Sequence, residues 1–111
     1  MASLLRRVGA EFTANSTTAG FQWFQHIAPL SGGGFVIAWS DGVSDDSGVG
    51  ITAQRFDADG AKVGGEIQIN NLVLSNQYDP SVAGLASGGF IATWTGEGNG
   101  TSSDIRLCQM G

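Results

Sequence analysis

The chain has little cysteine, proline or charge. Its 111 residues include one cysteine, two prolines and five Lys or Arg residues, and the formal net charge is −5. Cys108 alone cannot form an intrachain disulfide, so nothing in the sequence requires an oxidising compartment. Nucleic acid is not an expected partner, because its binding needs a dense cationic surface that five scattered basic residues do not provide.

Long apolar runs are also missing. The longest stretch, residues 34–39, is far too short to cross a bilayer, so we expect no membrane insertion. The N-terminal sequence Met-Ala-Ser-Leu-Leu-Arg-Arg-Val-Gly contains no apolar segment of signal-peptide length. The sequence therefore shows no export signal and does not assign the chain to a compartment.

A repeat organises what is present. Residues 11–41 recur at a constant offset of 55 positions: Glu11, Asn15, Gln22, Ala28, Leu30, Gly33, Gly34, Phe35 and Trp39 return as Glu66, Asn70, Gln77, Ala83, Leu85, Gly88, Gly89, Phe90 and Trp94. This period lies near the roughly 40 to 50 residues of propeller blades, which bury their apolar faces by stacking on copies of themselves. We expect one domain over residues 1–111, with repeats at 11–65 and 66–111.

Each repeat is predicted to contain four antiparallel strands joined by glycine-rich turns. The predicted strands are 24–30, 34–40, 49–56 and 66–70 in the first repeat, and 81–85, 89–95 and 104–110 in the second. The second repeat lacks its fourth strand, while residues 11–15 match a fourth strand that has no third strand before it. We expect residues 11–15 to complete the second repeat, within one chain or between chains, and so to cover an open sheet edge.

Side-chain alternation assigns the faces of these strands. Residues 34–40 are apolar on both sides, which is typical of a strand between stacked sheets, whereas residues 66–70 alternate polar with apolar and belong at a rim. The predicted fold class is all-β: two four-stranded, propeller-like blades, with the ring completed by homo-oligomerisation because a propeller needs at least about four blades. A trimer is favoured. The alternative is a self-contained eight-stranded sandwich or barrel.

Three segments resemble the tandem repeats of large bacterial secreted and surface proteins. They are the sequences Gly-Gly-Phe-Val-Ile-Ala-Trp at 33–39, Asp-Asp-Ser-Gly at 45–48 and Ala-Gln-Arg-Phe-Asp-Ala-Asp-Gly at 53–60. The resemblance covers about residues 10–107, and it implies adhesion or display rather than catalysis. The proteins that it resembles often also carry calcium-binding glycine-rich segments.

One loop contains candidate calcium ligands. Asp41, Asp45 and Asp46 lie in a glycine-rich stretch, and calcium prefers several carboxylate and carbonyl oxygens on a flexible loop. The corresponding stretch of the second repeat does not reproduce this spacing, and neither stretch has the EF-hand pattern. A solvated acidic turn is the alternative interpretation.

The aromatic residues suggest a second candidate site. Exposed aromatic rings beside amides suit a carbohydrate, whose C–H face stacks on a ring while its hydroxyls form directional hydrogen bonds. The candidate ligand-binding residues are Gln22, Trp23, Gln77, Tyr78, Trp39 and Trp94. Packing between blades explains the same aromatics, and it is the first explanation for Trp39 and Trp94, which end apolar strands.

Catalysis finds no recognisable motif. The single histidine, His26, lies in an apolar strand, and no serine occupies a Gly-x-Ser-x-Gly elbow. We therefore expect a non-catalytic binding module that recognises carbohydrate or cell surfaces through a cyclic oligomer. The alternative is a structural or interaction element without a small-molecule ligand.

Overall fold

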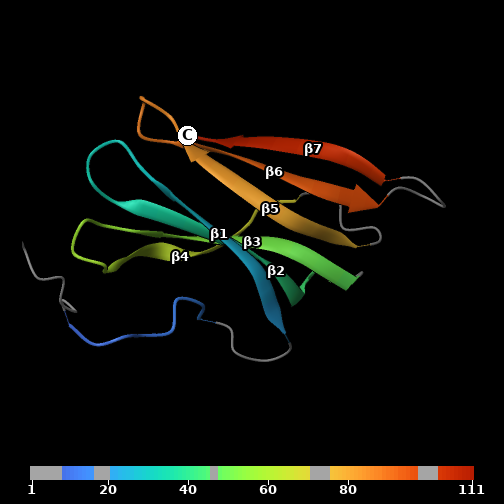
Figure 1. Ribbon diagram of the computed structural model, residues 1–111, viewed down its shortest axis with the longest axis horizontal. Helices are drawn as coiled ribbons and strands as arrows, with labels where there is room; N and C mark the ends of the chain where they lie inside the picture. Colours follow the sequence, from blue (N-terminus) through green and yellow to red (C-terminus); the bar gives the residue numbers. More distant parts are fainter. Residues whose placement is uncertain (1–8, 17–20, 46–47, 71–75, 98–102) are drawn as a thin grey trace, which may run out of the picture.

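The computed structural model describes residues 9–16, 21–45, 48–70, 76–97 and 103–111. Within these ranges, four strands form the first sheet, in chain order, and three form the second sheet. All neighbouring strands are antiparallel, and Figure 1 shows the two sheets as stacked layers. The strands are β1 (Gln22–Pro29), β2 (Phe35–Asp45), β3 (Gly48–Phe56), β4 (Lys62–Gln68), β5 (Gln77–Gly84), β6 (Phe90–Glu97) and β7 (Ser103–Met110).

The fold class is all-β, as predicted. The described ranges contain no helix, and their strands do not close into a barrel. Across the same ranges, no helix that is long and apolar enough to cross a membrane occurs. The strand β4 lies at the edge of the first sheet, which confirms the predicted rim position of the fourth strand.

The two sheets share local geometry at positions 55 residues apart. Phe24 and Asp79 both have positive φ angles, 56° and 58°, which are uncommon outside glycine. Each lies where the strand register shifts, between Trp23 and His26 in β1 and between Tyr78 and Ser81 in β5. The same bulge therefore interrupts the first strand of each sheet and increases its twist.

The turns also follow the sequence. The Asp-Ala-Asp-Gly segment predicted to join the third and fourth strands does so, because the Asp57 side chain accepts hydrogen bonds from the backbone N–H groups of Asp59 and Ala61, each at 2.9 Å. In the β1–β2 turn, a Cβ atom on Gly34 would lie 2.3 Å from the carbonyl oxygen of Phe56. Glycine is required there by close backbone approach.

The core lies between the two sheets. The first sheet contributes Val36, Ala38, Ile51 and Ala53, and the second sheet contributes Val82, Phe90, Ala92 and Trp94; all eight are buried. The backbone N–H of Val82 donates to Nδ1 of His26 at 3.1 Å, so His26 links β5 to β1 across the layers. The faces that meet here are called the inner faces, and the opposite faces are called the outer faces.

Two strand predictions need correction. Residues 11–15 do not form a strand in this chain and do not pair with β7 within it. The strand β4 begins at Lys62 rather than at Glu66, because Gly64, at φ 71°, allows a register shift along β3 instead of ending the pairing.

The first sheet ends in a buried asparagine cap. Oδ1 of Asn70 accepts the backbone N–H of Ile51 at 2.8 Å, and the N–H of Ile69 donates to the carbonyl of Ile51. A second asparagine, Asn76, accepts the N–H of Val49 at 3.0 Å, but this contact is exposed. The two asparagines therefore offer a matched pair that differs in burial.

We predict that Asn70→Ala lowers the free energy of unfolding by about 1–3 kcal/mol, because it leaves a buried N–H of β3 without its acceptor. Asn76→Ala should cost less than about 1 kcal/mol, since water can replace the exposed contact. Urea-induced unfolding, followed by tryptophan fluorescence, measures both values. Equal losses in the two variants would contradict the structural importance of the cap.

Candidate functional site

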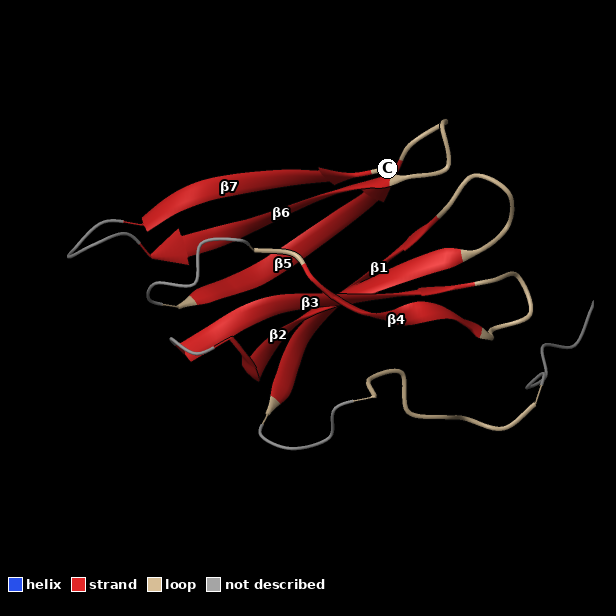
Figure 2. Cartoon of the chain, turned by 180° about the vertical axis from the view of Figure 1, so that it is seen from behind, coloured by secondary structure: helices blue, strands red, loops and turns tan. Residues whose placement is uncertain are grey.

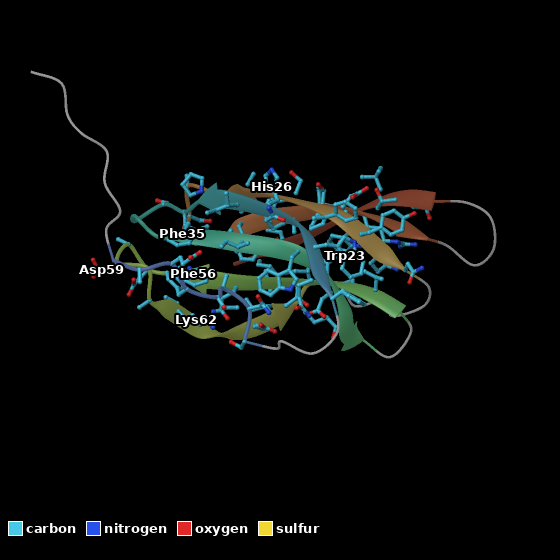
Figure 3. The ribbon with its side chains drawn as sticks, turned by 60° about the horizontal axis from the view of Figure 1, so that its bottom comes forward. Trp23, His26, Phe35, Phe56, Asp59 and Lys62 are labelled. Atoms are coloured by element: carbon cyan, nitrogen blue, oxygen red, sulfur yellow. The ribbon has the colours of Figure 1, made fainter. Side chains whose placement is uncertain are left out.

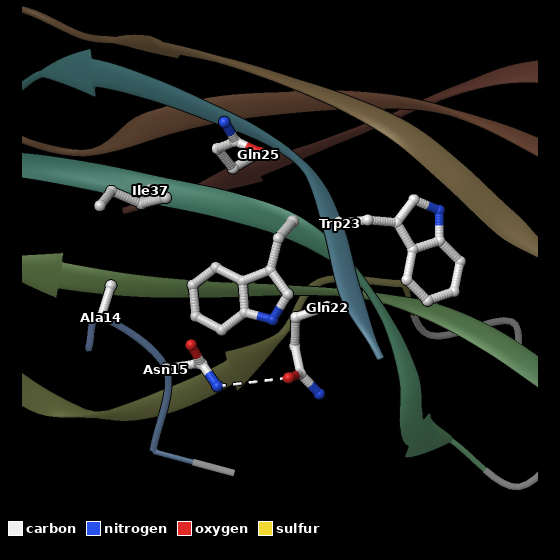
Figure 4. Close-up of a pocket in the computed structure, with 7 residues that line it drawn as sticks. Ala14, Asn15, Gln22, Trp23, Gln25 and Ile37 are labelled. Carbon is white, nitrogen blue, oxygen red and sulfur yellow. Dashed lines mark hydrogen bonds between the residues drawn. The ribbon is translucent and has the colours of Figure 1, made fainter. Parts of the chain in front are cut away.

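A pocket of about 230 Å³ opens on the outer face of the first sheet. Its lining combines two indoles, three amide side chains and two aliphatic side chains, from Ala14, Asn15, Gln22, Trp23, Gln25, Ile37 and Trp39. We call it the indole pocket (Figure 4). The strands β1 and β2 supply five of these residues, and the segment 9–16 supplies the other two.

A chain of amide hydrogen bonds borders the pocket. Nδ2 of Asn15 donates to Oε1 of Gln22 at 3.3 Å, and Nε2 of Gln22 donates to Oδ1 of Asp41 at 3.4 Å. Asp41 is fully buried. Gln22 thus holds the N-terminal segment at one end and a buried carboxylate at the other.

The polar atom of Trp39 is not satisfied in this arrangement. Trp39 is only 3% exposed, and its Nε1 is buried and has no hydrogen-bond partner among the residues that the structure describes. A buried N–H without an acceptor costs roughly 1–3 kcal/mol. The first sheet therefore contains a buried donor that lacks the acceptor its counterpart in the second sheet has.

The equivalent tryptophan of the second sheet is satisfied. Nε1 of Trp94 donates to Oε1 of Gln77 at 2.9 Å, and both residues are buried at the inner faces. Gln77 and Gln22 occupy the same position of the repeat, but only Gln77 accepts from its tryptophan. The same glutamine–tryptophan pair therefore occurs in two environments. In the second sheet it is covered by the first sheet, whereas in the first sheet it lies on the outer face, which no sheet in the described ranges covers.

The structure brings together only part of the predicted carbohydrate site. Gln22, Trp23 and Trp39 line the indole pocket, together with the unpredicted residues Asn15 and Gln25. Gln77 and Trp94 are enclosed between the sheets, and Tyr78 lies beside them, half-buried, in β5. The recurrence of Asn15 as Asn70 was a usable sequence signal, whereas nothing in the sequence singled out Gln25.

Aromatic contacts fix Trp23 at the edge of this pocket. Its ring lies 6.5 Å from that of Phe21 and 6.3 Å from that of Phe24, both in edge-to-face arrangements. Figure 3 shows Trp23 toward one end of the first sheet, and Phe35, Phe56 and Lys62 toward the other. Phe21 and Phe24 are largely exposed, so the aromatic cluster extends onto the surface.

Two of the three predicted calcium ligands lie in β2. Asp41 is buried and bonded to Gln22, Asp45 ends β2, and Asp46 lies outside the described residues. Among the residues that the structure describes, no group of three or more His, Cys, Asp or Glu side chains is arranged to hold a metal. Calcium binding at Asp41, Asp45 and Asp46 stays a prediction.

Comparisons with protein-family models, with curated proteins and with solved structures found no match. The resemblance to bacterial surface repeats therefore also stays a prediction. The main clue to function is that equivalent residues of the two sheets differ in burial.

The contrast between Gln77 and Gln22 leads to a stability prediction. Gln77→Ala should lower the free energy of unfolding by about 1–3 kcal/mol, because the buried Trp94 N–H loses its acceptor. Gln22→Ala should cost less than Gln77→Ala, since Trp39 does not donate to Gln22 and its hydrogen bonds with Asn15 and Asp41 are long, at 3.3 Å and 3.4 Å, and only part-buried. Urea titrations at concentrations where the chain is monomeric test the difference, and a larger loss in Gln22→Ala would contradict it.

Proposed function

We propose that this chain is a non-catalytic assembly module that stacks head to tail on copies of itself. The outer face of the second sheet in one copy binds the outer face of the first sheet in the next copy. The interface would repeat the one that already joins the two sheets inside the chain. The observation that carries the proposal is the exposure of residues whose repeat equivalents are fully buried.

The outer face of the second sheet supplies the clearest case. In β7, Ile105 is 79% exposed and Leu107 is 65% exposed. Their equivalents in β3, by strand pairing, are Ile51 and Ala53, and both are fully buried beneath the second sheet. The second sheet thus presents the same kind of apolar surface that the first sheet uses for packing, but without a layer on top of it.

The outer face of the first sheet is the complementary half. Val82 is 5% exposed at the inner face of β5, whereas its equivalent Ile27 in β1 is 59% exposed. Phe90 and Ala92 are buried in the same way, and their equivalents Phe35 and Ile37 are only partly covered. A second sheet from another copy would cover these positions as β5 and β6 cover the first sheet within the chain.

Such an interface joins two different surfaces, so a linear stack of copies leaves one uncovered surface at each end. Both surfaces are covered only when the rotation between copies completes a ring. Each copy supplies two sheets, and rings of stacked sheets need at least about four. A closed ring of copies, with the trimer favoured, satisfies both conditions. It also removes the exposed apolar faces at both ends of a linear stack.

Leu107→Lys tests the stacking. Burying a leucine stabilises an interface by about 1.5–3 kcal/mol, so replacing it with a charge should weaken self-association at least about tenfold. Light scattering across a concentration series measures the mass of each form. The control Ala86→Lys makes a similar change in the β5–β6 turn, away from both outer faces, and should assemble like the wild type.

A wild-type chain that stays monomeric at every concentration would overturn the proposed function. Assembly that Leu107→Lys leaves intact would also overturn it, because Leu107 lies centrally in the proposed contact. Circular dichroism on each variant establishes that the fold is retained before the masses are compared.

A second candidate function, carbohydrate binding, is favoured by the indole pocket. The amides of Asn15, Gln22 and Gln25 line it together with Trp23 and Trp39. These groups match the apolar face and the directional hydroxyls of a sugar. A saccharide would compete with a neighbouring copy for part of the same face, so the two functions predict opposite effects of ligand on assembly.

Trp23→Ala tests this candidate. A saccharide that binds the pocket should change tryptophan fluorescence in a saturable way, and Trp23→Ala should abolish most of that change. The matched control is Tyr78→Ala, which alters the equivalent position of the second sheet and should leave the response intact. No saturable response across a panel of monosaccharides, or an equal loss in both variants, would exclude the site.

A further inference from the structure

The strand β7 has an unpaired edge. Within the described ranges, β7 pairs with β6 on one side and with no strand on the other. Its equivalent in the first sheet, β3, is flanked on that side by β4. An exposed row of backbone N–H and C=O groups readily accepts another strand, and here its neighbouring side chains, Ile105 and Leu107, are exposed as well.

The segment 9–16 matches the strand that is missing. Residues 9–15 read Gly-Ala-Glu-Phe-Thr-Ala-Asn and align with Gly-Gly-Glu-Ile-Gln-Ile-Asn at 64–70, in β4 and its continuation. The backbones agree at the first position, where Gly9 has φ 82° and Gly64 has φ 71°. The segment therefore carries the sequence and the glycine conformation of a fourth strand, although it forms no strand in the isolated chain.

The segment already lies on the face where a neighbour would stack. The ring of Phe12 lies 6.1 Å from that of Phe56, Nζ of Lys62 donates to Oγ of Ser16 at 3.0 Å, and Asn15 lines the indole pocket. In Figures 1 and 2 it runs along the first sheet, on the side away from the second sheet. Phe12 remains 62% exposed there.

Chain connectivity identifies the sheet to which the segment belongs. Within the chain, β4 is the last strand of the first sheet, and the residues after it lead into β5 of the next sheet. Residues 9–15 precede β1 as β4 precedes β5. They should therefore be the last strand of a sheet that packs on the outer face of the first sheet. In a head-to-tail assembly, that sheet is the second sheet of a neighbouring copy.

We propose that residues 9–15 of one copy pair with β7 of the neighbouring copy as its fourth strand. This inference rests on the proposed head-to-tail stacking and adds to it an exchanged strand. The register follows from β3 and β4, where Ala53 lies opposite Ile67. This register places Phe12 opposite Leu107. It also lets Oδ1 of Asn15 accept a hydrogen bond from the N–H of Ile105, as Oδ1 of Asn70 accepts one from the N–H of Ile51.

The exchange also accounts for the unsatisfied Trp39. In the isolated chain, Oε1 of Gln22 accepts from Asn15. When Asn15 moves to β7 of the neighbour, that contact ends, and Gln22 can accept from Nε1 of Trp39. The first sheet then acquires the bond that Gln77 already makes to Trp94.

An engineered disulfide tests the exchange. In a Cys108→Ser background, Phe12→Cys is combined with Leu107→Cys, which places the two sulfurs on directly opposite residues of the proposed pair. The control pair, Phe12→Cys with Asp104→Cys, moves one sulfur three residues, or about 10 Å, along β7, which is too far for a disulfide. Oxidised samples are analysed on non-reducing gels, and light scattering gives the mass of the assembled form.

The exchange predicts covalent multimers up to the ring mass in the first pair and few or none in the control pair. Oligomers that form without cross-links, or that cross-link equally in both pairs, would overturn the exchange and leave the stacking intact. An intrachain disulfide in monomers would also overturn it. Monomers without cross-links would overturn the exchange, and they would overturn both proposals if the wild-type chain is monomeric at the same concentration.

Hydrogen exchange on the unmodified chain provides a test that needs no variant. Ile105 corresponds to Ile51, whose N–H points to the β4 side of β3 and donates to Asn70. The N–H groups of Ile105 and of Leu107, two residues further along β7, should therefore point toward the free edge. Concentrations that favour assembly should slow their exchange at least about tenfold if the edge is paired. Unchanged exchange in a sample shown by light scattering to be assembled would overturn the strand exchange.

Discussion

The structure depends on the burial of two unlike sheet faces against each other. Val36, Ala38 and Ile51 form the small, flat side of this contact, and Phe90 and Trp94 form the bulky side. An apolar sheet face must be covered to be stable in water, and unlike faces fit because large side chains meet small ones. Each repeat carries both kinds of face, so a chain of two repeats covers one pair and presents the other.

Much of the fold could be predicted because the repeat fixes strand order and turn chemistry. The segment 34–40 was recognisable as a central strand by its apolar residues on both sides, and the turn at 57–60 by its aspartates and glycine. Strand bounds were harder. The strand predicted to begin at Ser81 begins at Gln77, because β5 continues through a bulge at the left-handed Asp79 that the sequence pattern does not indicate.

The candidate site could be predicted only in part, because sequence equivalence does not specify environment. Trp39 and Trp94 are indistinguishable by pattern, but Trp94 packs at the inner faces and Trp39 borders a pocket. Residues 11–15 also have the pattern of a strand, and their failure to pair within the chain follows from geometry. Their matching edge belongs to the second sheet, whereas the segment leads directly into β1 of the first sheet.

A bound sugar and a stacked copy make different demands on the outer face of the first sheet. A sugar would use the indoles and the amides of the indole pocket, and it would leave the rest of the face in water. Ile27 and Phe35 lie outside the pocket lining, yet Ile27 is largely exposed and Phe35 is only partly covered. Covering such side chains is a consequence of sheet stacking, and it has no counterpart in sugar recognition. The extent of the apolar face therefore favours assembly as the main function, with the pocket as a feature of the junction between copies.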